Sequence, residues 1–118
     1  MIIKRNNLME EKRKLKRFIL YFNVIEQTSG RLLGYSGDIH QKGLMLVSKY
    51  EIPLIMDIPV LVQVPGEVGV KSEIPLVING IWNQLNMNPH FYNTGCRIVD
   101  PSQGVIDAIN ELVKEFSA

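Results

Sequence analysis

The sequence predicts an all-β protein that ends in one α-helix, and three observations lead to this fold class. About six runs rich in β-branched and aromatic residues follow one another, separated by short turns. No helical pattern lies between these runs, which favours an antiparallel sheet or a small barrel over a parallel sheet. Only the last segment of the chain carries apolar residues at helical spacing.

The first three predicted strands cover residues 18–26, 31–39 and 44–48. The first is aromatic and β-branched, and a Thr-Ser-Gly turn follows it. In the second, Leu33, Tyr35 and Ile39 alternate with small or polar residues. This period of two predicts a half-buried strand with those three side chains on one face.

The other predicted strands cover residues 60–64, 74–85 and 91–100. Residues 49–59, which precede them, contain Pro53 and Pro59. Because proline lacks an amide hydrogen for the ladder, this stretch is predicted to be a loop or an edge segment. A Pro-Gly turn follows the strand at 60–64.

The C-terminal segment predicts an amphipathic helix that covers one open side of the sheet. Six apolar residues share one helical face: Val105, Ile106, Ile109, Leu112, Val113 and Phe116. Either Asp100 or Ser102 can cap this helix, and Pro101 suits its first turn.

Length and composition predict one cytoplasmic domain. The chain has 118 residues, of which 46% are hydrophobic, enough for one core. No apolar run approaches the length of a membrane span. The N-terminus has no pattern of a secretory signal, and a single cysteine fits a reducing compartment.

Charge divides the chain into a basic N-terminal arm, residues 1–17, and a β-domain, residues 18–118. The arm holds seven of the 13 basic residues and carries a net charge of +5, whereas the rest carries −4. This asymmetry suggests an anionic partner for the arm. The alternative is a solvated, poorly ordered terminus.

Motifs of catalysis and of metal binding are missing from the sequence. It has no zinc-ligand spacing, no P-loop and no nucleophile elbow. Cys96 alternates with Thr94 and Ile98 in the last predicted strand, so it is predicted to be a buried structural thiol. The sequence therefore favours a binding module without cofactors over an enzyme.

Two groups of residues have the chemistry to bind an anionic, guanine-containing ligand, although each alone is a weak signal. Arg13 and Arg17 stand just before the first strand, and guanidinium groups bind phosphates or the O6 and N7 edge of guanine. Asp38 and His40 project on one polar face of a turn that ends at Gly43. A carboxylate there can accept the N1–H and N2–H of guanine, and the glycine allows close approach. The alternatives are a plain basic tail and an ordinary hairpin.

Taken together, these residues resemble the PilZ domain, the bacterial receptor module for cyclic di-GMP. The likeness extends from about residue 11 to residue 116. It rests on an RxxxR motif that runs into a hydrophobic strand and on a [D/N]xSxxG turn about 20 residues later. The matching residues are Arg13, Arg17, Asp38 and Gly43, with further support from Trp82, the segment 92–100 and the closing helix.

The resemblance implies a six-stranded antiparallel barrel with a C-terminal helix. Arg13 and Arg17 would hold the phosphates and the outer guanine edges, Asp38 would bind a guanine, and Gly43 would permit close approach. The nucleotide would order the arm against the barrel, and the module would signal through a partner protein, for example in motility.

The main departure from the family pattern is His40, which stands where the family has serine. Histidine can donate to a phosphate or stack on a base, and it can also block the site. Arg97 alternates outward on the last strand and could join the ligand face. The alternative for Arg97 is a solvated or ion-paired side chain. For the function of the whole chain, the alternative to a cyclic di-GMP receptor is a degenerate PilZ domain. Such a domain binds no nucleotide and acts as a protein-interaction adaptor.

Nucleic acid is a third possible partner, and the composition disfavours it. The basic arm could bind phosphates, which would make binding steeply salt-dependent. However, residues 18–118 are acidic and show no basic strand with aromatic residues for base stacking.

Overall fold

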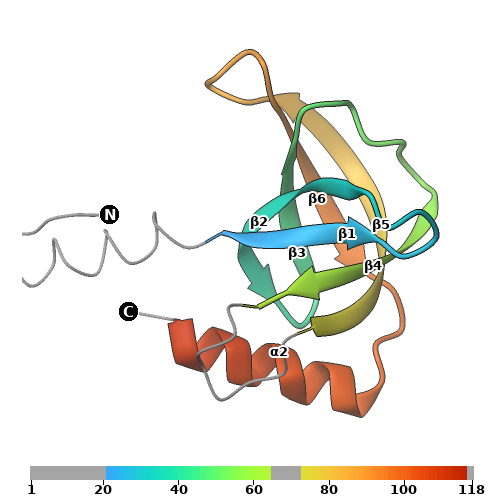
Figure 1. The fold of residues 1–118 in the computed structure, drawn as a ribbon, viewed down its shortest axis with the longest axis vertical. Coiled ribbons are helices and arrows are strands. Elements are labelled where there is room, and N and C mark those ends of the chain that lie inside the picture. Colours follow the sequence, from blue (N-terminus) through green and yellow to red (C-terminus); the bar gives the residue numbers. More distant parts are fainter. Residues whose placement is uncertain (1–20, 65–72, 117–118) are drawn as a thin grey trace, which may run out of the picture.

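Six antiparallel strands close into a barrel, and one helix follows them (Figure 1). The computed structural model describes residues 21–64 and 73–116. The elements are β1 (Phe22–Glu26), β2 (Leu32–His40), β3 (Gly43–Ser48), β4 (Asp57–Gln63), β5 (Glu73–Leu85), β6 (Tyr92–Ile98) and α2 (Gln103–Phe116). This confirms the predicted fold class and decides for a barrel over an open sheet.

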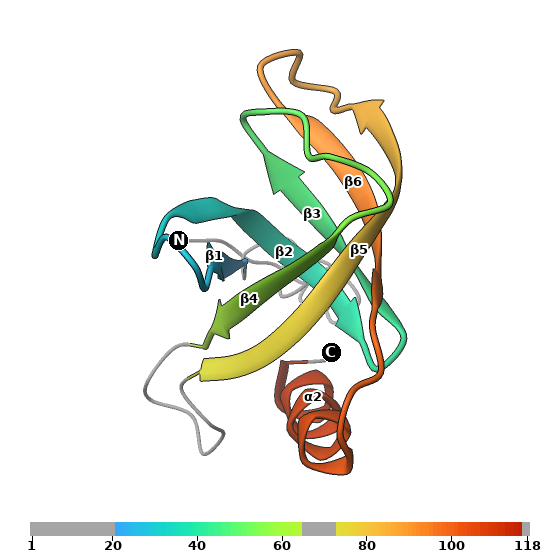
Figure 2. The same cartoon turned by 90° about the vertical axis from the view of Figure 1, so that its right-hand side faces the viewer.

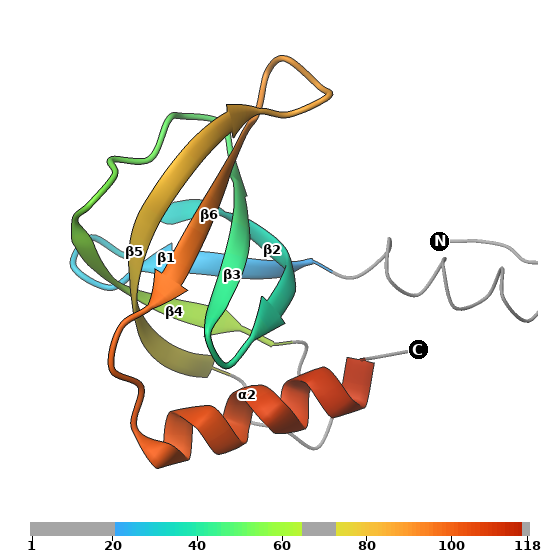
Figure 3. The ribbon, with the colours of Figure 1, turned by 180° about the vertical axis from the view of Figure 1, so that it is seen from behind.

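The order of strands around the barrel is β1-β2-β3-β6-β5-β4, and β4 pairs again with β1. Chain neighbours form the pairs within β1–β3 and within β4–β6, and the β3–β6 and β1–β4 pairs join the two halves. Figure 3 shows β3, β6 and β5 side by side. Every strand of the described residues has two partner strands, although residues 82–85 of β5 extend beyond β4 and pair with β6 alone.

The core consists of the inward side chains of all six strands together with one face of α2. Leu46, Ile74 and Ile78 are fully buried inside the barrel, and Ile109 and Leu112 add the helical face. The helix lies across one end of the barrel (Figure 2) and contacts β2 and β5. No helix in residues 21–64 and 73–116 is long and apolar enough to cross a bilayer.

Ser102 caps the helix, which decides between the two predicted caps. The backbone amide of Val105 donates to Ser102 Oγ at 3.2 Å, the usual bond of an N-cap residue. Asp100 instead takes a positive φ of 40° in the connection from β6. The cap therefore begins the helix directly after the bend that turns the chain from β6 towards the end of the barrel.

The prediction for residues 49–59 is wrong at its C-terminal end, because β4 begins at Asp57 and includes Pro59. The carbonyl of Pro59 accepts from the amide of Gln27, just beyond the end of β1. A strand residue directs its amide and carbonyl to the same side, so Pro59 faces the place where the β1 ladder has already ended. The missing amide hydrogen therefore removes a bond only at the end of the β1–β4 pairing.

The predicted faces of β2 are also wrong on the N-terminal side of a bulge. Ser36 and Ile39 are both buried, whereas Tyr35 is 37% exposed. The pairing of β2 with β3 shifts register between Tyr35 and Asp38, and such a bulge reverses the face that later residues occupy. After the shift, Asp38 and His40 are both exposed, on the shared face that the sequence predicted.

Candidate ligand-binding site

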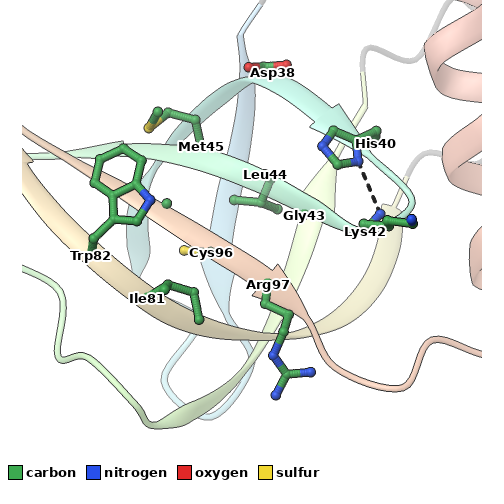
Figure 4. Close-up of a pocket in the computed structure, with 11 residues that line it drawn as sticks. Asp38, His40, Lys42, Gly43, Leu44, Met45, Ile81, Trp82, Cys96 and Arg97 are labelled. Carbon is green, nitrogen blue, oxygen red and sulfur yellow. Dashed lines mark hydrogen bonds between the residues drawn. The ribbon is translucent and has the colours of Figure 1, made fainter.

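A hollow of about 370 Å³ lies on the outer surface of the barrel, across β2, β3, β6 and β5 (Figure 4). Four residues singled out in the sequence line it: Asp38, His40, Gly43 and Arg97. The fold thus brings together residues that are up to 59 positions apart in the sequence. The other two predicted site residues, Arg13 and Arg17, lie outside the described residues.

Strand pairing places His40, Gly43 and Arg97 in one row across the sheet. His40 pairs with Gly43, and Gly43 pairs with Arg97. Neighbouring strands lie about 4.8 Å apart, so the backbones of His40 and Arg97 are about 10 Å apart. Because the middle residue has no side chain, the row presents two nitrogen-bearing side chains on either side of a gap.

A second row runs parallel to the first, two residues further along the strands. It consists of Asp38, Met45, Gly95 and Trp82, each paired with the next. A Cβ atom on Gly95 would lie 2.4 Å from indole atoms of Trp82, so the ring rests directly on the glycine backbone. Trp82 is still 40% exposed. This row therefore has a carboxylate at one end and an aromatic surface at the other.

Two charged side chains of the hollow are unpaired within the part of the chain that the structure describes. Within residues 21–64 and 73–116, neither the Arg97 guanidinium nor the Asp38 carboxylate takes part in an ion pair or a side-chain hydrogen bond. Arg97 and Lys42 make one end of the hollow positive, and Asp38 makes another part negative. No group of three metal-ligating side chains occurs in the described part of the chain.

Gly43 has a packing role that the sequence did not reveal. A Cβ atom at this position would lie 2.5 Å from the backbone carbonyl oxygen of Cys96, far inside van der Waals contact. The glycine is therefore required by the close approach of β3 and β6, with or without a ligand. The gap between His40 and Arg97 is a consequence of this packing, because glycine has no side chain to fill it.

Cys96 lies beneath the hollow and is a buried thiol, as predicted. It is 7% exposed, and burial raises its pKa from 9.0 to about 11, because an apolar environment disfavours the thiolate. The Sγ atom lies 3.7 Å from the carbonyl oxygen of Thr94, to which it donates. The thiol is therefore protonated at neutral pH and unsuited to nucleophilic chemistry.

Four apolar residues of the hollow were not predicted to line a site: Leu44, Met45, Ile81 and Trp82. The β5–β6 pairing shifts register between Gly80 and Trp82, and this bulge leaves Ile81 and Trp82 both exposed. Strict alternation would have sent one of the two inward. The only signal in the sequence for these residues was Trp82. It supported the family resemblance, but no role in the site was predicted for it.

Comparison with protein-family models, curated proteins and solved structures finds no match for this chain. The resemblance to the PilZ domain thus rests on the residues quoted above and stays a prediction. The fold that the resemblance implied is the fold observed, but a six-stranded barrel with a helix does not identify a ligand.

Proposed function

We propose that this protein is a receptor for cyclic di-GMP, which binds in the hollow between β2 and β5. The observation that carries the proposal is the register of the sheet. In one row, the donors His40 and Arg97 lie on either side of a gap. The next row holds the carboxylate of Asp38 and the aromatic ring of Trp82. A cyclic dinucleotide of guanine needs this combination of groups.

The row of His40, Gly43 and Arg97 suits a phosphate group. The guanidinium of Arg97 has no partner among the described residues, and it can donate two parallel hydrogen bonds to phosphate oxygens. The gap above Gly43 lets the phosphate approach the sheet between the two donors. Lys42, which also lines the hollow, adds positive potential at this end.

The row of Asp38, Met45, Gly95 and Trp82 suits a guanine base. The carboxylate of Asp38, which has no partner among the described residues, can accept hydrogen bonds from both N1–H and N2–H, a pair of donors that adenine lacks. The exposed indole of Trp82 offers a surface on which a base can stack, an interaction worth about 1–3 kcal/mol. Selectivity for guanine would then come from Asp38 and part of the affinity from Trp82.

The basic arm would complete the site. Arg13 and Arg17 would hold the phosphates and the outer guanine edges, as the resemblance implies, and the +5 charge of residues 1–17 attracts a dianionic ligand. The output of the receptor would be contact with a partner protein once the nucleotide has fixed the arm. The alternative remains a degenerate domain that contacts a partner without nucleotide.

Titration of the full chain with cyclic di-GMP tests the proposal. Trp82 is the only tryptophan, so its fluorescence reports directly on the hollow, and calorimetry gives the affinity. We expect saturable heat and a change in tryptophan emission with cyclic di-GMP, and much weaker binding of cyclic di-AMP. No heat and no emission change at high micromolar cyclic di-GMP would remove the proposal and leave the adaptor alternative.

The variant Asp38→Asn tests the role of the carboxylate. The amide keeps the shape of the side chain but offers only one acceptor, so we expect cyclic di-GMP to bind at least about tenfold more weakly, as for loss of a charge-assisted hydrogen bond. Asp107→Asn on α2 is the matched control, since it removes the same charge outside the hollow. Equal affinities of both variants would contradict the guanine contact.

A further inference from the structure

The side chain of His40 is held by its own turn. The backbone amide of Lys42 donates to His40 Nδ1 at 3.2 Å (Figure 4), and the turn consists of the two residues between His40 and Gly43. The same bond, from an amide to a side-chain acceptor two residues earlier, occurs three more times in the described chain. The acceptors there are Ser29 Oγ, Asn86 Oδ1 and Asn88 Oδ1.

This bond determines which nitrogen of His40 carries the proton. An imidazole nitrogen accepts a hydrogen bond only through a free lone pair, so Nδ1 has no proton. The neutral ring then has its proton on Nε2, since one of its nitrogens is a donor and the other an acceptor. Figure 4 shows the second ring nitrogen turned away from Lys42 and towards the hollow.

We propose that the turn fixes His40 as the Nε2–H tautomer and thereby makes Nε2–H a hydrogen-bond donor to a phosphate oxygen of the ligand. The tautomer follows from the turn alone, whereas the phosphate contact rests on the proposed function. The proposal also explains how histidine can stand at a serine position. A serine hydroxyl can make the same turn bond, as Ser29 does, and histidine adds a donor with a longer reach.

The first experiment determines the tautomer without any ligand. Long-range ¹H–¹⁵N correlation spectra separate protonated from unprotonated ring nitrogens of histidine. The chain has only two histidines, so the spectrum of His40→Gln contains His90 alone and assigns both. We expect a protonated Nε2 and an unprotonated Nδ1 for the neutral ring of His40. A predominant Nδ1–H form, or equal averaging of the two forms, overturns the proposal.

The second experiment uses two variants of His40. One keeps the acceptor for the Lys42 amide, and the other keeps a donor near the position of Nε2. His40→Asn keeps an acceptor for the Lys42 amide, as Asn86 and Asn88 show, but its own donor does not reach the position of Nε2. His40→Gln extends an amide NH₂ group to about that position and gives up the turn acceptor. Thermal unfolding of both variants verifies that they fold.

Calorimetry with cyclic di-GMP then separates the proposal from the proposed function. We expect His40→Gln to bind within about threefold of the wild type and His40→Asn about tenfold more weakly, as for loss of a hydrogen bond to a charged group. If the wild type binds and His40→Asn binds equally well, the donor role is wrong and the receptor function stands. If the wild type binds no nucleotide, both the function and the phosphate contact fail, and the spectra still decide the tautomer.

Discussion

Two glycines, Gly43 and Gly95, shape the hollow because neighbouring atoms occupy the space that a side chain would need. At Gly43 the obstacle is the carbonyl oxygen of Cys96, and at Gly95 it is the indole of Trp82. Each glycine lies between two side chains of the proposed site in its row. At these two positions, the lack of a side chain both permits tight packing and leaves the binding surface accessible.

Gly43→Ala is expected to destabilise the barrel. The new Cβ atom would meet the Cys96 carbonyl oxygen at 2.5 Å, so β3 and β6 must separate. Such overpacking costs about 1–3 kcal/mol, which lowers the melting temperature by roughly 3–10 °C in circular dichroism. Gly104→Ala is the control, because the nearest atom to its new Cβ lies 3.9 Å away. An unchanged melting temperature for Gly43→Ala would contradict the close approach.

Cys96 predicts a loss of stability at alkaline pH. Its folded pKa is raised from 9.0 to about 11, so above pH 9 the unfolded chain releases the thiol proton first. The folded state then binds more protons, and the free energy of unfolding falls as pH rises. The contribution is complete below pH 9 and is lost as pH rises through about 11. Its size is about 2–3 kcal/mol.

Urea unfolding at pH values from 8 to 11 measures this effect, with Cys96→Ala as the reference. The variant lacks the thiol but keeps all other titrating groups of the chain. The difference in unfolding free energy between wild type and variant should therefore shrink as pH rises. A difference that stays constant over this range would show that burial does not perturb the thiol.

Among the elements, two bulged strands decide which side chains reach the hollow. The shift in β2 brings Asp38 and His40 to the outer face after Ser36 has pointed inward. The shift in β5 leaves Ile81 and Trp82 both on the outside. A regular strand of either sequence would place part of this set in the core, so the bulges build the site.

The helix α2 stabilises the barrel by burying one face over its end. Leu112 is 1% exposed, and we expect Leu112→Ala to lower the free energy of unfolding by about 2–5 kcal/mol, as is typical of large-to-small changes in a core. Glu111→Ala changes the neighbouring exposed residue and should have little effect. Chemical denaturation measures both, and similar values for the two variants would show that the helix is not part of the core.

For the whole molecule, the important feature is the opposition of charge between a +5 arm and a −4 remainder. Arg13→Ala combined with Arg17→Ala is expected to weaken cyclic di-GMP binding by at least about tenfold, which corresponds to about 1.4 kcal/mol. The matched control is Lys4→Ala with Arg5→Ala, which removes the same charge from the same segment. Equal losses in calorimetry would indicate general attraction by the arm and no special role for the two arginines.

The sequence by itself determined the class of the fold. Runs of β-branched residues, short turns and one amphipathic segment were sufficient, because each is a local pattern that favours one type of element. The helical face at Ile109 and Leu112 and the buried thiol of Cys96 followed from the same periodicities. The shared exposure of Asp38 and His40 was also predictable, since the two residues lie after the bulge.

Strand periodicity left the closure of the barrel open, although the family resemblance implied it, and only the tertiary structure decided the composition of the hollow. Local pattern does not tell which distant strands pair, so the row of His40, Gly43 and Arg97 appears only once β3 has paired with β6. Bulges insert single residues without a clear signal in the sequence, which is why Tyr35 was predicted on the wrong face and Trp82 on none. The clash that makes Gly43 necessary likewise depends on an atom of another strand, the carbonyl oxygen of Cys96.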